Sequence, residues 1–248
     1  MAAGIDTVWA RDEEQSSGPQ PLSRDAIVAA AIEIADADGL EAVSIRRLAT
    51  KLDARPMSLY SHIGRKGDLI DLMVDEVLAG AIIPGGVPTD DWREALRQIA
   101  QRTRESTRAH PWIIGAAFHR HPFLGPNALR HIDQSLAAVS ELPLSPERKR
   151  AVLLAIDTYT LGFVRWEVMS PKSDGDTPCA GRPEAGPSAA EIDAYLAAQT
   201  AGGDYPHLAE FIGTKMGLGV KAEKFEIGLE WLLTGIEAEV GSAQSASD

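Results

Sequence analysis

The amino-acid sequence predicts an all-α fold, in which a small N-terminal helical domain is followed by a larger helical body. Apolar residues recur every three to four positions along most of the chain, which places them on one face of successive helices. Breaks rich in glycine and proline separate these stretches, and convincing strand alternation is absent from the sequence. We expect about nine or ten helices from this pattern. The clearest stripes are Ile27, Ala31, Ile34 and Ala35; Ile70, Met73, Val74 and Val77; Trp92, Leu96 and Ile99; Leu129, Ile132, Leu136 and Val139; Val152, Ile156, Tyr159 and Phe163; and Phe225, Leu229, Leu232, Ile236 and Val240.

The first helix is expected to begin after Ser23, whose side chain can cap it, and to end at Gly39. Leu22 and Ile27 are spaced as a hydrophobic staple around that start. Residues 1–21 are polar and lack periodicity, so we expect a disordered N-terminal extension there. The first domain therefore starts at residue 22.

The segment Pro-Gly-Gly-Val-Pro at residues 84–88 is the expected seam between the two domains. It divides the ordered chain into a domain at residues 22–83 and a body at residues 89–241. No window reaches the roughly 18 consecutive apolar residues of a membrane span, and the N-terminus lacks the pattern of a secretory signal. Together with a single cysteine, Cys179, which cannot form an internal disulfide, this predicts a cytoplasmic protein.

Charge is distributed unevenly along the chain. The net charge of −12 is unfavourable for binding nucleic acid, because phosphate contacts depend on Lys and Arg. Residues 44–66 reverse this balance, since they carry six Lys and Arg residues and a single acid, Asp53. One small basic surface on an acidic molecule is typical of a protein that meets nucleic acid through that surface alone.

The basic segment has the spacing of a helix-turn-helix. Ser44 can cap a short helix that ends near residue 52, and the turn Asp53-Ala54-Arg55 follows it. Pro56 suits the first turn of a second short helix, and Gly64 ends that helix. If Leu59 and Ile63 anchor the second helix, its polar side chains point outward, where they suit the edges of bases and phosphates in a major groove. The side chains expected to point outward are Met57, Ser58, Tyr60, Ser61 and His62.

This region resembles the N-terminal domain of the tetracycline-repressor (TetR) family, most specifically in GLEAVSIRRLATKL and SLYSHIGRKGDLID. The resemblance implies a dimeric, ligand-responsive repressor that binds a palindromic double-stranded DNA operator. One departure is Asp53, because relatives often carry glycine in that turn. The implied DNA contacts are Arg46 and Lys66 on phosphates, Pro56, Met57, Ser58 and Ser61 over bases, and Tyr60 and His62 on the DNA backbone.

The body resembles the tetracycline-repressor-like C-terminal domain in HPWIIGAAFHRHPFLGPNALR, AIDTYTLGFVRWE and FEIGLEWLLTGIEAEV. In this family the helices that contain these segments line an effector cavity, and such cavities combine aromatic walls with a few polar groups. Arg165 and Glu167 are polar candidates there, although core packing is the alternative for each aromatic. The candidate ligand-binding residues are Trp112, Phe118, His119, Tyr159, Phe163 and Trp166.

Four histidines, His110, His119, His121 and His131, raise a metal or anionic-ligand site as a hypothesis. Their spacing disfavours it, because His119 and His121 fall on different sides of a helix, so we assign no metal and no cofactor. His119 matches the position where the tetracycline repressor uses a histidine for its drug-bound magnesium. The run from residue 78 to 83 has no histidine to match another drug contact, which disfavours tetracycline itself.

Two apolar helices at about residues 147–168 and 221–240 are expected to form a four-helix bundle with their symmetry mates. The Phe225-to-Ile236 part of the last stripe would form the contact, with Gly162, Gly228 and Gly235 allowing close approach. A homodimer also suits the DNA geometry, because one short recognition helix reads only a few base pairs.

Two other function classes stay open at this point. The first is an all-helical ligand-binding protein or enzyme that retains a helix-turn-helix-like element. The sequence contains no GxSxG, P-loop, GxGxxG or nucleophilic Cys/His arrangement, so we expect no catalysis. The second is a DNA-binding activator without an effector, and sequence does not separate activator from repressor, because that depends on where the operator lies relative to a promoter.

Overall fold

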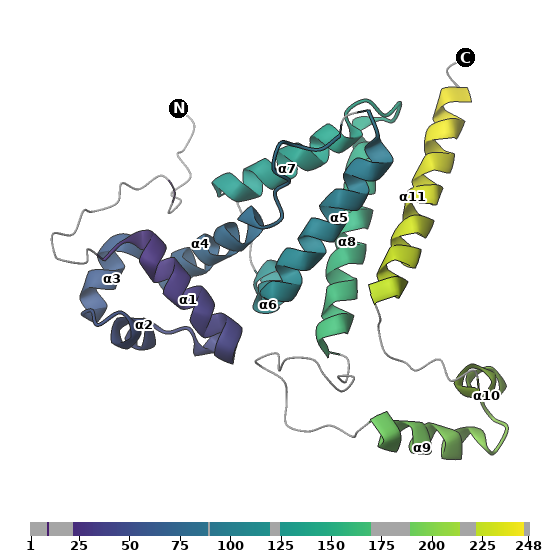
Figure 1. The fold of residues 1–248 in the computed structure, drawn as a ribbon, viewed down its shortest axis with the longest axis horizontal. Helices are drawn as coiled ribbons and strands as arrows, with labels where there is room; N and C mark the ends of the chain where they lie inside the picture. The colour runs from purple at the N-terminus through teal and green to yellow at the C-terminus, as the bar shows by residue number, and fades with distance from the viewer. Residues whose placement is uncertain are drawn as a thin grey trace.

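The computed structural model describes Trp9 and residues 22–88, 90–119, 125–169, 189–213 and 222–245. The regular structure in these ranges is helical throughout, with eleven α-helices and a 3-10 helix at Leu40–Ala42 (Figure 1). This confirms the predicted all-α class. The number of α-helices is slightly higher than the nine or ten expected from the sequence.

Four helices follow one another in the N-terminal domain. The Ser23 side chain accepts a hydrogen bond from the backbone N–H of Ala26 at 3.1 Å, and Gly39 ends the first helix with a positive φ. Both ends lie where the sequence predicts them, because a serine cap and a glycine stop satisfy the backbone groups that a helix leaves unpaired. The helices are α1 (Arg24–Asp38), α2 (Ile45–Lys51), α3 (Pro56–Ile63) and α4 (Lys66–Ala79).

The body consists of long helices that run beside one another. In Figure 1, α5 and α8 lie side by side, α7 packs on both and reaches α4, and α11 packs along α8. The helices α9 and α10 contact each other and lie apart from the other helices in the same view. None of the helices in the described ranges combines the length and apolarity needed to cross a lipid bilayer. The body helices are α5 (Trp92–Ala109), α6 (Trp112–His119), α7 (Pro126–Val139), α8 (Pro146–Met169), α9 (Ala189–Thr200), α10 (Pro206–Gly213) and α11 (Ala222–Ser245).

Two apolar clusters hold these helices together. The first fills the space among α1, α2, α3 and α4, and it also takes in Trp112 and Ile113 from α6. The second lies among α5, α7, α8 and α11, and Leu96, Ile156 and Phe225 are among its buried members. A helix that follows the predicted seam in sequence therefore shares its apolar core with the N-terminal domain.

Candidate DNA-binding and effector sites

The segment α2–turn–α3 has the geometry of a helix-turn-helix. Ser44 caps α2 through a 3.3 Å hydrogen bond from the Arg47 N–H, and Pro56 occupies the first turn of α3. Asp53 in the intervening turn has a φ of 47°, a left-handed conformation that glycine adopts without strain and that Asp tolerates better than most residues. Asp53 therefore places an acid at a turn position whose backbone conformation favours glycine, the residue that relatives often carry there.

The outer face of α3 is polar and exposed. Leu59 and Ile63 are fully buried and anchor the helix, as the sequence predicts. Met57 on the opposite face is 76% exposed, and Tyr60 is exposed near it. The Ser61 hydroxyl donates to the Ser58 carbonyl at 2.9 Å, so the oxygen of Ser61 is left as an acceptor.

The expected orientation of His62 is wrong. Its side chain is only 4% exposed, and its carbonyl accepts a 3.1 Å hydrogen bond from Nε of Arg24 on α1. The cause is helical spacing, because His62 follows Leu59 by three positions and neighbours Ile63, so it lies on the inward face with both. The sequence contained this signal, and the polarity of histidine outweighed it in our interpretation.

Ion pairs reduce the positive charge that the basic segment can offer to a ligand. Arg47 pairs with Asp38, the Nζ of Lys51 lies 2.8 Å from a carboxylate oxygen of Glu33, and Arg65 pairs with Asp68. The three remaining Lys and Arg residues of the segment form no ion pair within the described ranges. These are Arg46, Arg55 and Lys66, and all three are exposed.

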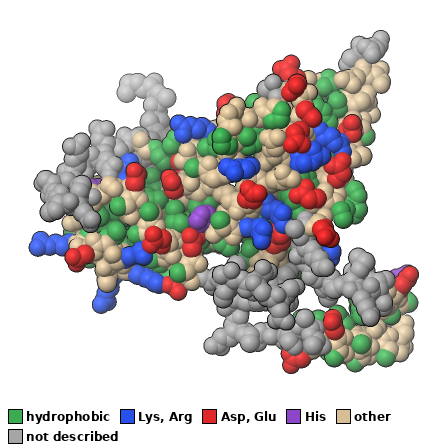
Figure 2. All heavy atoms as spheres, in the orientation of Figure 1, with side chains coloured by type: hydrophobic (Ala, Val, Ile, Leu, Met, Phe, Trp, Pro, Cys, Tyr) green, Lys and Arg blue, Asp and Glu red, His purple; other side chains and the backbone are tan. Residues whose placement is uncertain are grey.

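The surface around α2 and α3 reflects this mixture. Figure 2 shows Lys and Arg side chains projecting from the end of the molecule formed by α1, α2 and α3, with Asp and Glu between them. A surface hollow of about 520 Å³ lies between α1 and α2, and its lining includes both Glu33 and Arg46. The acids of α1 thus orient cations of α2, while exposed acids elsewhere on the molecule would be repelled by DNA phosphates.

In the body, the predicted effector residues Tyr159 and Phe163 lie together in an aromatic cluster with Phe225 of α11. Ring centroids are 5.9 Å apart for Tyr159 and Phe163 and 5.2 Å apart for Phe163 and Phe225. The Tyr159 hydroxyl donates to the carbonyl of Phe225 at 2.8 Å, and burial raises the pKa of this phenol. These side chains therefore join α8 to α11 within one protomer.

A largely buried ion pair borders the aromatic cluster. Arg104 of α5 donates from Nε to Glu167 of α8 at 3.0 Å, and the two side chains are 12% and 11% exposed. The guanidinium carbon of Arg104 also lies 4.7 Å from the Phe225 ring centroid, a cation–π contact. Glu167 was a polar candidate from sequence, whereas Arg104 was missed because its partners lie far away in the chain.

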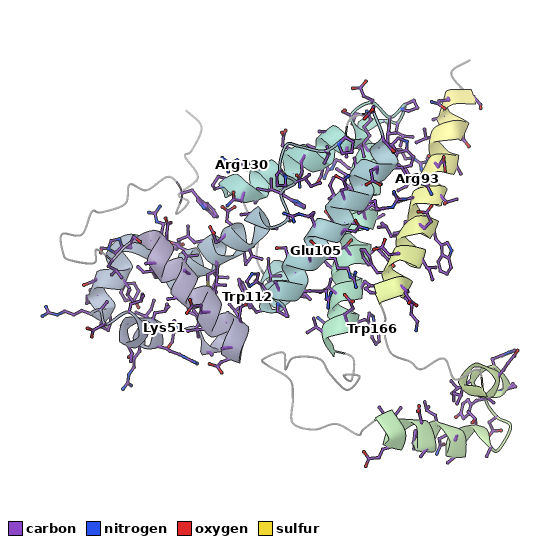
Figure 3. The ribbon with its side chains drawn as sticks, in the orientation of Figure 1. Lys51, Arg93, Glu105, Trp112, Arg130 and Trp166 are labelled. Carbon is purple, nitrogen blue, oxygen red and sulfur yellow. The ribbon has the colours of Figure 1, made fainter. Side chains whose placement is uncertain are left out.

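The other predicted effector residues are not brought into this cluster. Trp112 lies between α1 and α6 (Figure 3), where its indole N–H donates to Asp36 at 2.8 Å. Trp166 is largely exposed near the end of α8, as Figure 3 also shows. The side chains of Phe118 and His119 lie outside the described residues.

The four histidines have separate surroundings where they are described. The Nδ1 of His110 lies 2.9 Å from Asp36, so this ring shares its carboxylate with Trp112. His131 is half-buried on α7 beside Gln134, and this partial burial lowers its pKa. His121 lies outside the described residues, and the described ranges contain no group of three or more side chains arranged to hold a metal ion.

The apolar stripe assigned to the dimer contact serves another purpose. Phe225 and Leu229 are buried inside the protomer against α5 and α8, and a side chain at Gly228 would collide with the Tyr159 hydroxyl. The close approach that Gly228 allows is therefore intramolecular. Different residues of the same two helices are exposed: Leu154 on α8, and Ile227 and Trp231 on α11, with Trp231 75% accessible.

Charged contacts fix α11 against α5 on the side away from α3. Arg93 points from α5 toward α11 (Figure 3), where it bonds Thr234 at 3.1 Å and Glu237 at 2.8 Å. Arg97 donates to Glu230 at 3.0 Å and to Glu94 at 2.8 Å. Hydrogen bonds from Arg93 and Arg97 lower the pKa of the Glu230 carboxyl, and hydrogen bonds from Gln98 and Arg97 lower that of Glu94. The exposed apolar residues of α11 thus lie on a helix that these contacts fix against α5.

Comparison with known proteins gives concordant results. Residues 84–240 match the family model described as "Tetracyclin repressor-like, C-terminal domain". The HTH-type transcriptional repressor DrrR1 of Streptomyces coeruleorubidus is 32% identical over the whole chain and 89% of its own length. The class E tetracycline repressor protein of Escherichia coli is 27% identical over 58% of this chain and 67% of its own.

Solved structures agree with the sequence matches. Apo ActR from Streptomyces coelicolor superposes with a TM-score of 0.72 at 28% identity, covering 92% of this chain and 100% of ActR. ActR in complex with actinorhodin gives the same TM-score and identity over 90% of this chain and 100% of ActR. The likeness extends over both the N-terminal helices and the body.

Proposed function

This chain belongs to the TetR family of transcriptional regulators, and we propose that it is a repressor that binds a palindromic DNA operator as a homodimer and is released by a small-molecule effector. The observation that carries the proposal is the outer face of α3. Met57, Ser58, Tyr60 and Ser61 are exposed there, on a helix anchored from behind by Leu59.

In this proposal α3 enters the major groove and its side chains divide the work of recognition. Met57, Ser58 and Ser61, together with Pro56, approach base edges, where a serine oxygen can accept from a base and a thioether can contact a thymine methyl. Tyr60 reaches the sugar-phosphate backbone. His62 is left out of the contacting side chains because its ring is buried.

Arg46 and Lys66 are proposed to contact phosphates on either side of α3. Arg46 lies on the exposed face of α2, and Lys66 is the first residue of α4. Neither is engaged in an ion pair with a described residue, so each can neutralise a phosphate without breaking an internal contact. Phosphate contacts of this kind give affinity that falls as salt rises.

For the effector we propose a site in the body that includes Tyr159 and Phe163. ActR has been crystallised with actinorhodin and with (S)-DNPA, so a relative of the same fold holds small molecules. In this chain the aromatic surface of the cluster and the Arg104–Glu167 pair offer the apolar walls and few polar groups that such sites combine. Trp112, Phe118, His119 and Trp166 stay as predicted contacts.

Release requires the effector to bind one conformation of the body better than another. A ligand that inserts between α5, α8 and α11 would move these helices, and only its differential affinity for the two arrangements can shift the DNA-binding equilibrium. Because α7 joins the body to α4, such a movement would change the placement of α3 in each protomer.

The test of this function is a DNA-binding titration with DNA from upstream of the gene for this protein. Specific binding that saturates at one dimer per site is the expected result, with binding to scrambled DNA at least about a thousandfold weaker at physiological salt. Actinorhodin is the first effector probe, followed by a compound library. Equal affinity for specific and scrambled DNA would refute the DNA-binding role, whatever the effector screen gives.

A further inference from the structure

A buried carboxylate on α4 caps the start of α7. Asp75 is 4% exposed, and its oxygens accept hydrogen bonds from the backbone N–H groups of Asn127 at 3.1 Å and Ala128 at 2.9 Å. These N–H groups belong to the first turn of α7, where they have no partner inside the helix. The negative charge of Asp75 also lies at the positive end of the helix dipole, which strengthens the contact.

Glycine at position 125 makes this contact possible. A Cβ at Gly125 would collide with the Asp75 carboxylate, so a side chain there would push α4 away from the end of α7. Gly125 has an ordinary extended backbone, with a φ of −71°, so its small size and not its conformational freedom is what the contact needs. The start of α7 is therefore built around a side chain from the other domain.

A second contact joins the same two helices further along. The Gln134 side chain of α7 donates from Nε2 to the carbonyl of Ala81, and its Oε1 accepts from the N–H of Ile83, both at 3.0 Å. Ala81 and Ile83 lie two and four residues beyond the end of α4, where backbone groups no longer have the partners of a continuing helix. One buried amide thus satisfies both and fixes the end of α4 against α7.

We infer that Asp75 and Gln134 are positioning residues that set where the recognition helix α3 lies relative to the body. Together they form the α4–α7 clamp, with one contact at the first turn of α7 and the other two turns later. The helix α4 packs on α1 and α3, and α7 packs on α5 and α8. Movement of α7 is therefore transmitted to α3 as a rigid displacement, and loss of the clamp lets the two domains move independently. The consequence for operator binding rests on the proposed function.

The clamp is tested on the full-length homodimer without any effector. Spin labels are placed at Ala29→Cys, an exposed position on α1, in a Cys179→Ser background, and pulsed electron spin resonance gives the distance distribution between the two protomers. Asp75→Asn retains the size of the side chain but removes its charge and one acceptor oxygen. Gln134→Met retains the length of the side chain and removes its hydrogen bonds to Ala81 and Ile83, together with its contact to His131. The matched control is Glu76→Gln, an exposed acid on the same helix.

Both clamp variants are expected to broaden the distance distribution by at least half of its original width, with Glu76→Gln unchanged. Widths equal to the control in folded Gln134→Met protein would overturn the inference, and this variant decides the matter if Asp75→Asn does not fold. A second measurement uses operators with half-sites moved apart by one base pair. The clamped protein should lose at least tenfold in affinity on them, and the clamp variants less than threefold.

The two measurements separate the inference from the function on which it rests. If the unmodified protein does not bind operator DNA, the proposed function fails while the distance distributions still test the clamp. If it binds and the clamp variants show the same spacing preference as Glu76→Gln, the positioning role is refuted and the DNA-binding role stands.

Discussion

Asp157 on α8 gives a pH-dependent stability that can be measured directly. Burial raises the pKa of this carboxyl from 3.8 to about 6, because the charged form loses hydration. A folded state in which an acid has the higher pKa binds its proton more tightly than the unfolded state does. The free energy of unfolding therefore falls as pH rises through the interval from 3.8 to about 6, and the penalty is fully present above it.

The size of the effect follows from the two pKa values. A difference between 3.8 and about 6 corresponds to about 3 kcal/mol per protomer at neutral pH. Asp157→Asn removes the ionisation and keeps the shape. We expect the variant to be more stable than the unmodified protein by up to about 3 kcal/mol at pH 8, with little difference at pH 4.

Urea unfolding at several pH values between 4 and 8 measures both the pH dependence and the effect of Asp157→Asn. The protomer concentration is held fixed because the stability of a dimer depends on it. Asp133→Asn, on the exposed face of α7, is the matched control and should follow the unmodified protein at every pH. A difference between Asp157→Asn and the unmodified protein that is the same at pH 4.5 and pH 8 would refute the assignment of a raised pKa to this half-buried carboxyl.

Four further predictions follow from the sites. Arg46→Ala should weaken binding to all DNA sequences alike and lower the slope of log affinity against log salt concentration by roughly one per lost phosphate contact. Ser58→Ala should instead alter the base preference, at about 1–3 kcal/mol per lost base contact. Titrations on operator and scrambled DNA at several salt concentrations separate the two effects. Trp231→Asp should convert the dimer to monomer in light scattering, and a dimer that persists at micromolar concentration would place the interface elsewhere. Trp112→Phe should lower the free energy of unfolding by about 1–3 kcal/mol, because it removes the hydrogen bond from the indole N–H to the Asp36 carboxylate. Chemical denaturation measures this, and an unchanged midpoint would contradict the prediction. Phe163→Ala should alter the response to an effector while operator affinity stays within about tenfold, and failure of the variant to fold would show that Phe163 is a core residue.

Local patterns in the sequence predicted most of the N-terminal domain. Ser23, Ser44 and Pro56 signal helix starts through their own side chains, so the caps and the helix-turn-helix followed from short-range chemistry. The orientation of His62 was equally readable, since three-residue spacing from Leu59 places it inward. Helical spacing therefore predicts the orientation of a histidine better than its polarity does.

Contacts between distant segments were not predictable in the same way. A stripe such as Phe225 to Ile236 indicates a helix face that must be covered, and it does not say whether the cover is α8 of the same protomer or a partner. From the sequence we therefore predicted the dimer contact on the stripe that α5 and α8 bury. In the structure, Trp231 on another face of α11 is exposed instead. Asp36 and Asp75 are similar cases, because an acid among helical residues reads as a solvated side chain until its partners from another helix are known.

The position of α6 has a consequence for chimeric regulators, in which the DNA-reading part of one protein is fused to the sensing part of another. Residues 22–83 form a continuous module in the sequence, but their apolar core is completed by Trp112 and Ile113 from beyond the junction. A fusion made at the PGGVP segment would transfer the N-terminal helices without the α6 residues that complete their apolar core. Apolar surface would be exposed, and the Asp36 carboxylate would lose its hydrogen bond from the Trp112 indole. If the α6 residues that pack in this core are exchanged together with residues 22–83, the core is complete again. The exchangeable unit is therefore discontinuous in the chain.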